Sequence, residues 1–127
     1  MPAVAQVRVT SAFMQSLSRA QASTIASLVA MGSQSGATVM GLSGVRRSRD
    51  LELVFVDVSI SDNTQQELAR LGAHGVRVFL VDGLDSVTTR MGRDDVHVLG
   101  VKEGDLAAGI VAKLPPPEAV EETDSLT

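Results

Sequence analysis

The sequence contains no cysteine, no tryptophan and no tyrosine, and its only aromatic residues are Phe13, Phe55 and Phe79. The lack of cysteine excludes disulfides, thiolate nucleophiles and cysteine-based zinc sites, and it is typical of the reducing cytoplasm, where we expect the protein to act. The scarcity of aromatic rings leaves little surface on which bases or sugars could stack. The core must therefore be mostly aliphatic.

Negative charge is concentrated at the C-terminal end. The chain carries 15 acidic and 11 basic residues, and four of the acids lie beyond the proline run 115–117. Residues 1–114 are therefore electrically neutral, with eleven side chains of each sign. A neutral body lacks the broad basic face of a strong non-specific nucleic-acid binder, but it leaves room for a small local patch.

The length of 127 residues predicts one domain. We divide it into an N-terminal lead-in and helical extension (1–24), an α/β domain (25–114) and a disordered acidic, proline-led tail (115–127). The N-terminal residues do not show a secretory signal. No apolar run approaches the roughly 20 residues that a membrane span needs, so no membrane partner is expected.

Helix and strand patterns alternate along the domain. Apolar spacing predicts one long or two shorter helices over 11–35, with Gly36 as the C-terminal cap. The remaining predictions are strands at 38–40, 51–56, 76–81 and 96–101, and helices within 41–49, 61–71, 82–92 and 105–113. Such alternation favours an α/β protein, here a three-layer α/β/α sandwich with a central mixed four-stranded sheet.

Residues that could perform catalysis are few. His74 and His97 are interpreted as solvated side chains in a turn and a strand, and Asp94–Asp95 as a solvated turn. Asp57 follows the strongest strand, where α/β sheets often bind ligands, but the acidic pair that a phospho-acceptor domain needs is missing. The glycines do not form a phosphate loop. We therefore expect no enzyme activity, no metal and no cofactor.

The densest positive feature is Arg46-Arg47-Ser48-Arg49. Guanidinium groups match the geometry of phosphates, which favours an anion-binding site. A solvated loop whose arginines neutralise Asp50 and Glu52 is the alternative interpretation, and composition favours it.

The order of several short motifs over residues 25–113 resembles one known family. The segments that carry the resemblance are Leu28–Met31, Ser35–Gly36, Val39–Gly41, Leu51–Val56, Ser61–Thr64, Gly75–Val81, Met91–Arg93 and Val98–Val101. The family is the ribosomal protein L-seven-Ae family of kink-turn RNA binders, and its bacterial branch has the most similar pattern. The resemblance implies a sandwich fold that binds sharply bent RNA.

In that family a Gly-x-Asn-Glu-x-x-Lys segment meets the RNA. The matching residues here, which we take as the RNA-binding candidates, are Gly41, Ser43, Gly44, Arg46 and Arg47. The glycine is kept and Arg47 stands where the family has lysine, but Ser43 and Gly44 replace the asparagine and glutamate. Because those two side chains can read base edges, their loss should remove specificity before it removes the fold.

Two functions of different classes remain open. The first is a non-catalytic protein that binds structured RNA, with the ribosome as one possible setting. The second is a protein-interaction module that kept the fold and lost the RNA. A predicted helical stripe of Phe13, Met14, Leu17 and Ala20 would cover the sheet edge or pack on a partner, giving a monomer or a weak oligomer.

Overall fold

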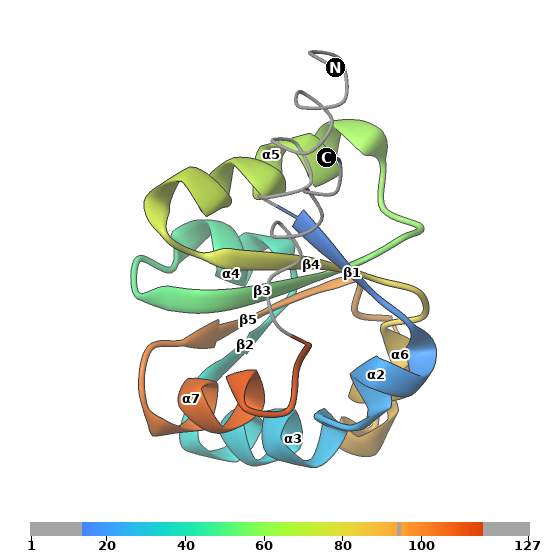
Figure 1. The fold of residues 1–127 in the computed structure, drawn as a ribbon, viewed down its shortest axis with the longest axis vertical. Coiled ribbons are helices and arrows are strands. Elements are labelled where there is room, and N and C mark those ends of the chain that lie inside the picture. Colours follow the sequence, from blue (N-terminus) through green and yellow to red (C-terminus); the bar gives the residue numbers. More distant parts are fainter. Residues whose placement is uncertain (1–13, 94, 116–127) are drawn as a thin grey trace, which may run out of the picture.

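The computed structural model describes residues 14–93 and 95–115, which form one mixed sheet with helices on both faces (Figure 1). The strands are β1 (Met14–Leu17), β2 (Thr38–Met40), β3 (Leu51–Asp57), β4 (Arg77–Val81) and β5 (Val98–Lys102). Their order across the sheet is β1-β4-β3-β5-β2. The predicted α/β/α sandwich is confirmed, but the sheet has five strands rather than four.

In the described part of the chain, six α-helices connect and cover the strands. They are α2 (Arg19–Ser23), α3 (Ala26–Ser35), α4 (Leu42–Arg47), α5 (Asp62–Ala69), α6 (Asp85–Thr88) and α7 (Asp105–Val111), and short 3₁₀ turns follow α5 and α6. The predicted helix boundaries are confirmed at two positions. The Ser61 hydroxyl accepts the N–H of Thr64 at the start of α5, and Gly36 ends α3 with φ of 86°.

The fifth strand replaces part of the predicted N-terminal helix. Met14–Leu17 pairs in parallel with Val78–Val81 at the sheet edge, and its inward-facing side chains alternate. The helix prediction was wrong here because Leu17 and Ala20 are three residues apart, a spacing that imitates a helical stripe. A strand with only two inward positions is too short to show its own period. Phe13, the first residue of that stripe, lies outside the described residues.

The direction of the strands places four loops at one edge of the sheet. β1, β3 and β4 are mutually parallel, and β5 is antiparallel to both β3 and β2. The carboxyl ends of β1, β2, β3 and β4 therefore lie at the same edge, together with the beginning of β5. We call this edge the carboxyl edge, and it is where open α/β sheets usually bind ligands.

β3 explains why helices cover both faces. Leu53 and Phe55 pack into the apolar layer beneath α2, α3, α6 and α7, whereas Val54 and Val56 pack into the layer beneath α4 and α5 (Figure 1). All four side chains are almost completely buried. A strand that is apolar on both faces must lie between two layers, as its near-continuous apolar run predicts.

A half-buried arginine in β4 joins the segment that follows α7 to the sheet. The Arg77 guanidinium donates to Gln15 Oε1 at 3.0 Å and to the Pro115 carbonyl at 3.4 Å, and it lies 5.0 Å from the Phe79 ring centroid. Burial lowers the pKa of Arg77. The predicted disordered tail beyond Pro115 falls outside the described residues. Within residues 14–93 and 95–115, no helix has the length and apolarity to cross a membrane.

Gly32 allows α3 to pack closely against β2 and α7. A Cβ atom at this position would overlap Thr38 Oγ1 and Leu106 Cδ2. We expect Gly32→Ala to lower the free energy of unfolding by about 1–3 kcal/mol, because such overpacking displaces neighbouring side chains. Urea denaturation measures this. Ser33→Ala in the same helix is the control, and an equal loss in both variants would contradict the close-packing role.

Candidate nucleic-acid interface

The predicted RNA-binding residues lie along one short segment, Gly41 to Arg47, which we call the α4 ledge. The ledge begins at the carboxyl edge, where the Gly41 N–H donates to the Val98 carbonyl at 2.8 Å. Gly41 has φ of 93° and ψ of 152°, a conformation that side chains with a Cβ rarely adopt. The glycine therefore sets the turn from β2 into α4.

Two glycines allow α4 to lie close to the sheet. A Cβ at Gly44 would lie 2.6 Å from Val39 Cγ1 of β2, and a Cβ at Gly100 of β5 would lie 3.4 Å from Val45 Cγ2 of α4. Val45, between Gly44 and the arginines, is buried beneath the helix. Gly44 thus faces the sheet. It does not add a side chain to a binding surface, but it allows α4 to pack closely against β2.

Arg46 is held by a carboxylate on the neighbouring helix. Its Nε and Nη2 atoms donate to Glu67 Oε2 and Oε1, both at 2.8 Å, so that the pair is bidentate and joins α4 to α5. These hydrogen bonds lower the pKa of Glu67. The sequence gives no sign of this pairing, because Glu67 lies 21 positions from Arg46.

Arg47 and Ser43 are the exposed polar residues of the ledge that remain available. Both face solvent. Within residues 14–93 and 95–115, Arg47 forms no ion pair. Its place in the last turn of α4 also suits the helix dipole, which favours a cation there. The structure therefore separates two arginines that the sequence presents as equivalent.

The remainder of the carboxyl edge is organised by the Asp57 carboxylate. Asp57 Oδ1 accepts the Leu84 N–H at 2.7 Å, and Oδ2 accepts both the N–H and the hydroxyl of Ser59. Burial by itself raises the pKa of Asp57, but the hydrogen bonds from Leu84 and Ser59 outweigh it, and the pKa is lowered overall. Asp57 thus joins the loops that follow β3 and β4.

The ion pair between Arg19 and Asp85 lies beside Asp57 at the carboxyl edge. Arg19, after β1, donates to both carboxylate oxygens of Asp85 at 2.9 and 2.8 Å, and its guanidinium lies over Gly83. A cavity of about 220 Å³ lies here, lined by Asp57, Asp85, Val96 and His97. No group of three acidic, histidine or cysteine side chains in the described part of the chain has a geometry suited to a metal ion.

The other chemical candidates are dispersed. His74 is exposed in the turn after α5, and His97 is exposed immediately before β5. Asp95 pairs with Arg93 at 3.3 Å. Asp94, its predicted companion, lies outside the described residues. Asp57, which the sequence suggested as a ligand position, has its carboxylate occupied by backbone and hydroxyl donors.

Asp57 should make stability depend on pH. Because its pKa is lower in the folded state than the unfolded value of about 3.9, its contribution is present above that value and is lost as the pH falls through the folded pKa. We expect Asp57→Asn to cost about 1–2 kcal/mol at neutral pH, because charge-assisted hydrogen bonds are lost.

The difference between wild type and Asp57→Asn should shrink as the pH is lowered from about 7 through the folded pKa of Asp57, because the wild-type side chain then also becomes neutral. Urea denaturation across this range measures it, with Asp50→Asn as the control at an exposed carboxylate. A difference that does not change with pH would contradict the assigned role of the charge.

Comparisons with known proteins leave the family undetermined. No protein-family model matches the chain, and no curated protein does. Among solved structures, the chain is similar to the Giardia lamblia 15.5kD RNA binding protein, with 18% sequence identity and a TM-score of 0.49 over 70% of this chain and 79% of that chain. At this level the likeness decides neither the family nor the function of this protein.

Proposed function

We propose that this is a non-catalytic RNA-binding protein that contacts structured RNA through the α4 ledge. The observation that carries the proposal is the exposed Arg47 guanidinium, which has no ion-pair partner among the described residues. Arginine binds phosphate through a planar fork of donors. Ser43, exposed on the same short helix, adds a hydroxyl that can donate or accept one hydrogen bond.

The proposed RNA is sharply bent, of the kink-turn class that the sequence resemblance implies. Gly41 supports this proposal because the space beside its Cα is open, so that a phosphate could approach the start of α4 closely. In the same proposal the protein acts in the cytoplasm, with the ribosome as one source of the RNA. The Giardia lamblia protein is described as RNA binding, which agrees with the proposal but does not carry it.

The affinity should be modest and sensitive to salt. RNA must compete with Glu67 for Arg46, so Arg47 provides most of the phosphate contact. Hydrogen bonds from Leu84 and Ser59 keep Asp57 ionised, and the pKa of Asp85 is lowered by its hydrogen bonds with Arg19. Asp85 is neutralised by Arg19, but the Asp57 carboxylate has no ion-pair partner among the described residues and repels phosphates, which favours RNA on the β2 side of the carboxyl edge.

A protein-interaction module that no longer binds RNA is the second candidate function. The pairing of Arg46 with Glu67 favours it, because the pair removes one of the two guanidinium groups of the ledge. The Asp57 carboxylate, which has no ion-pair partner among the described residues, also favours it, because its negative charge repels phosphates. The titrations below distinguish the two candidates.

Arg47→Gln should weaken RNA binding more than Arg49→Gln. Both changes remove one exposed positive charge, but only Arg47 lies on the ledge. With a fluorescent bulged RNA at low salt, we expect Arg47→Gln to lower the affinity about tenfold, because a hydrogen bond to a charged group is lost. The slope of log affinity against log salt should fall by roughly 0.7–0.9, the value of one phosphate contact.

Arg49→Gln should change the affinity by less than about twofold. Absence of wild-type binding to both bulged and plain duplex RNA at low salt would contradict the proposal and leave the protein-interaction module. An equal loss in both arginine variants would show that net charge, rather than the α4 ledge, attracts the RNA.

Glu67→Gln should strengthen RNA binding. Removing this carboxylate releases the Arg46 guanidinium, which then becomes available to a second phosphate. We expect a several-fold higher affinity and a steeper salt dependence in the same titration. Glu52→Gln removes an equal charge from β3 and is the matched control. If both variants gain equally, Arg46 does not contact the RNA.

A further inference from the structure

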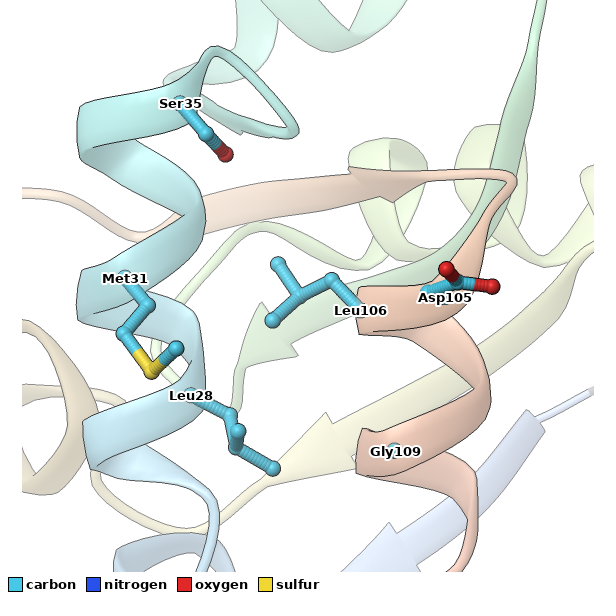
Figure 2. Close-up of a pocket in the computed structure, with 6 residues that line it drawn as sticks. All are labelled: Leu28, Met31, Ser35, Asp105, Leu106 and Gly109. Atoms are coloured by element: carbon cyan, nitrogen blue, oxygen red, sulfur yellow. The ribbon is translucent and has the colours of Figure 1, made fainter.

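Helices α3 and α7 lie side by side on the face of the sheet opposite α4 (Figure 1). A groove of about 410 Å³ runs between them, lined by Leu28, Met31, Ser35, Asp105, Leu106 and Gly109. Figure 2 shows the Leu28 and Leu106 side chains pointing from the two helices into the space between them. We call this surface, together with the exposed Ala108 and Ala112, the α3–α7 face.

Helices α3 and α7 contribute no charge to the α3–α7 face between Asp105 and Lys113, and the Arg90 guanidinium, which donates to Ser27 of α3 at 3.0 Å, borders the face. Residues 20–45 and 106–112 contain no acidic or basic side chain, although both helices lie at the surface. Protein surfaces that face only water usually carry about a quarter to a third charged residues. Met31, which is 58% exposed, projects from this uncharged region. Depletion of charge together with an exposed methionine is typical of the centre of a protein interface.

Gly109 has no explanation within the described part of the chain. It lies inside α7 without a positive φ, and a Cβ atom there would meet only Leu28 Cδ1, at an ordinary 3.9 Å. Gly32 differs, because a Cβ there would overlap two neighbours. Glycine is unfavourable in the interior of a helix, so its presence in α7 must have a reason other than helix stability or packing within the monomer. Close approach of a second backbone from outside supplies one.

The charges that flank Gly109 indicate which backbone could approach α7 at this position. Asp105 lies four residues before Gly109, and Lys113 lies four residues after it, in the turn that continues α7. If two α7 helices cross antiparallel about a two-fold axis at Gly109, each Asp105 faces the partner's Lys113. An axis at this point therefore pairs opposite charges at both ends and leaves only uncharged residues between them.

From this symmetry we infer that the α3–α7 face associates with the same face of a second copy of this chain. The contact is isologous, so that each copy offers one groove and one projecting Met31. Because both helices are short, the contact belongs to the weak and transient class of interfaces. This association does not depend on RNA binding, since the α4 ledge lies on the other face of the sheet (Figure 1).

Sedimentation velocity of the full chain, from about 1 to about 500 µM, tests the inference. The expected result is a reversible monomer–dimer equilibrium. Met31→Lys should weaken the dimer at least about tenfold, because it buries a charge at the interface. Val58→Lys is the matched control, since Val58 is also a large apolar residue, 45% exposed, but lies in the turn after β3. It should leave the dimer unchanged.

A charge exchange tests the two-fold arrangement itself. Asp105→Lys and Lys113→Asp should each weaken the dimer, because like charges then face each other across the axis. The double variant should restore the wild-type equilibrium. Thermal unfolding of each variant shows whether the fold is retained, and Gly109→Ala, which fits within the monomer, should weaken the dimer without loss of thermal stability.

A chain that stays monomeric over the whole range would overturn the inference and leave the face to a different protein. A dimer that Met31→Lys does not weaken, or that Val58→Lys weakens equally, would place the contact elsewhere. A double variant that stays as weak as the two single variants would overturn the antiparallel two-fold arrangement. The antiparallel two-fold arrangement is supported if the double variant restores the wild-type monomer–dimer equilibrium and Met31→Lys weakens the dimer.

Discussion

Burial of β3 on both faces is the constraint on which the rest of the structure depends. Leu53 and Phe55 on one side and Val54 and Val56 on the other leave no solvent-facing side chain in the strand centre. Helices must therefore cover both faces, and the connections between parallel strands bring the carboxyl ends of four strands to one edge. Polar side chains that cannot be buried in these apolar layers, such as Asp57, lie in the loops at that edge.

Asp57 and Asp85 at this edge, and Arg46 near the other end of α4, have partners within the protein. Asp57 accepts from Leu84 and Ser59, Asp85 pairs with Arg19, and Arg46 pairs with Glu67. These contacts hold neighbouring loops and helices together at the surface, where each ion pair contributes little to stability. Arg47 differs because no described residue pairs with it. The binding capacity of the ledge therefore depends on one guanidinium and on how readily Arg46 is released.

The sequence analysis identified correctly those elements that are long enough for the repeat of their apolar side chains to be recognised. β3, the Gly36 cap of α3 and the start of the helix predicted within 61–71 were correct, because an apolar run, a capping glycine and a capping serine are local signals. β1 was mistaken for helix because four residues cannot show a strand period, and its pairing with β4 joins positions more than 60 residues apart. The sequence does not predict that Glu67 pairs with Arg46, or that Gly44 lets α4 pack closely on the sheet. Both depend on contacts between segments that are distant in the sequence, which no local pattern indicates.

The measurement that tests the central claim most directly is an amide ¹H–¹⁵N NMR spectrum of the labelled protein with and without a bulged RNA. The account predicts that resonances of Gly41, Ser43 and Arg47, together with the beginning of β5, shift on addition of the RNA, while those of α3 and α7 do not. An unchanged spectrum, or shifts centred on Asp57 and Asp85 rather than on α4, would contradict the assignment of the α4 ledge as the RNA-binding surface.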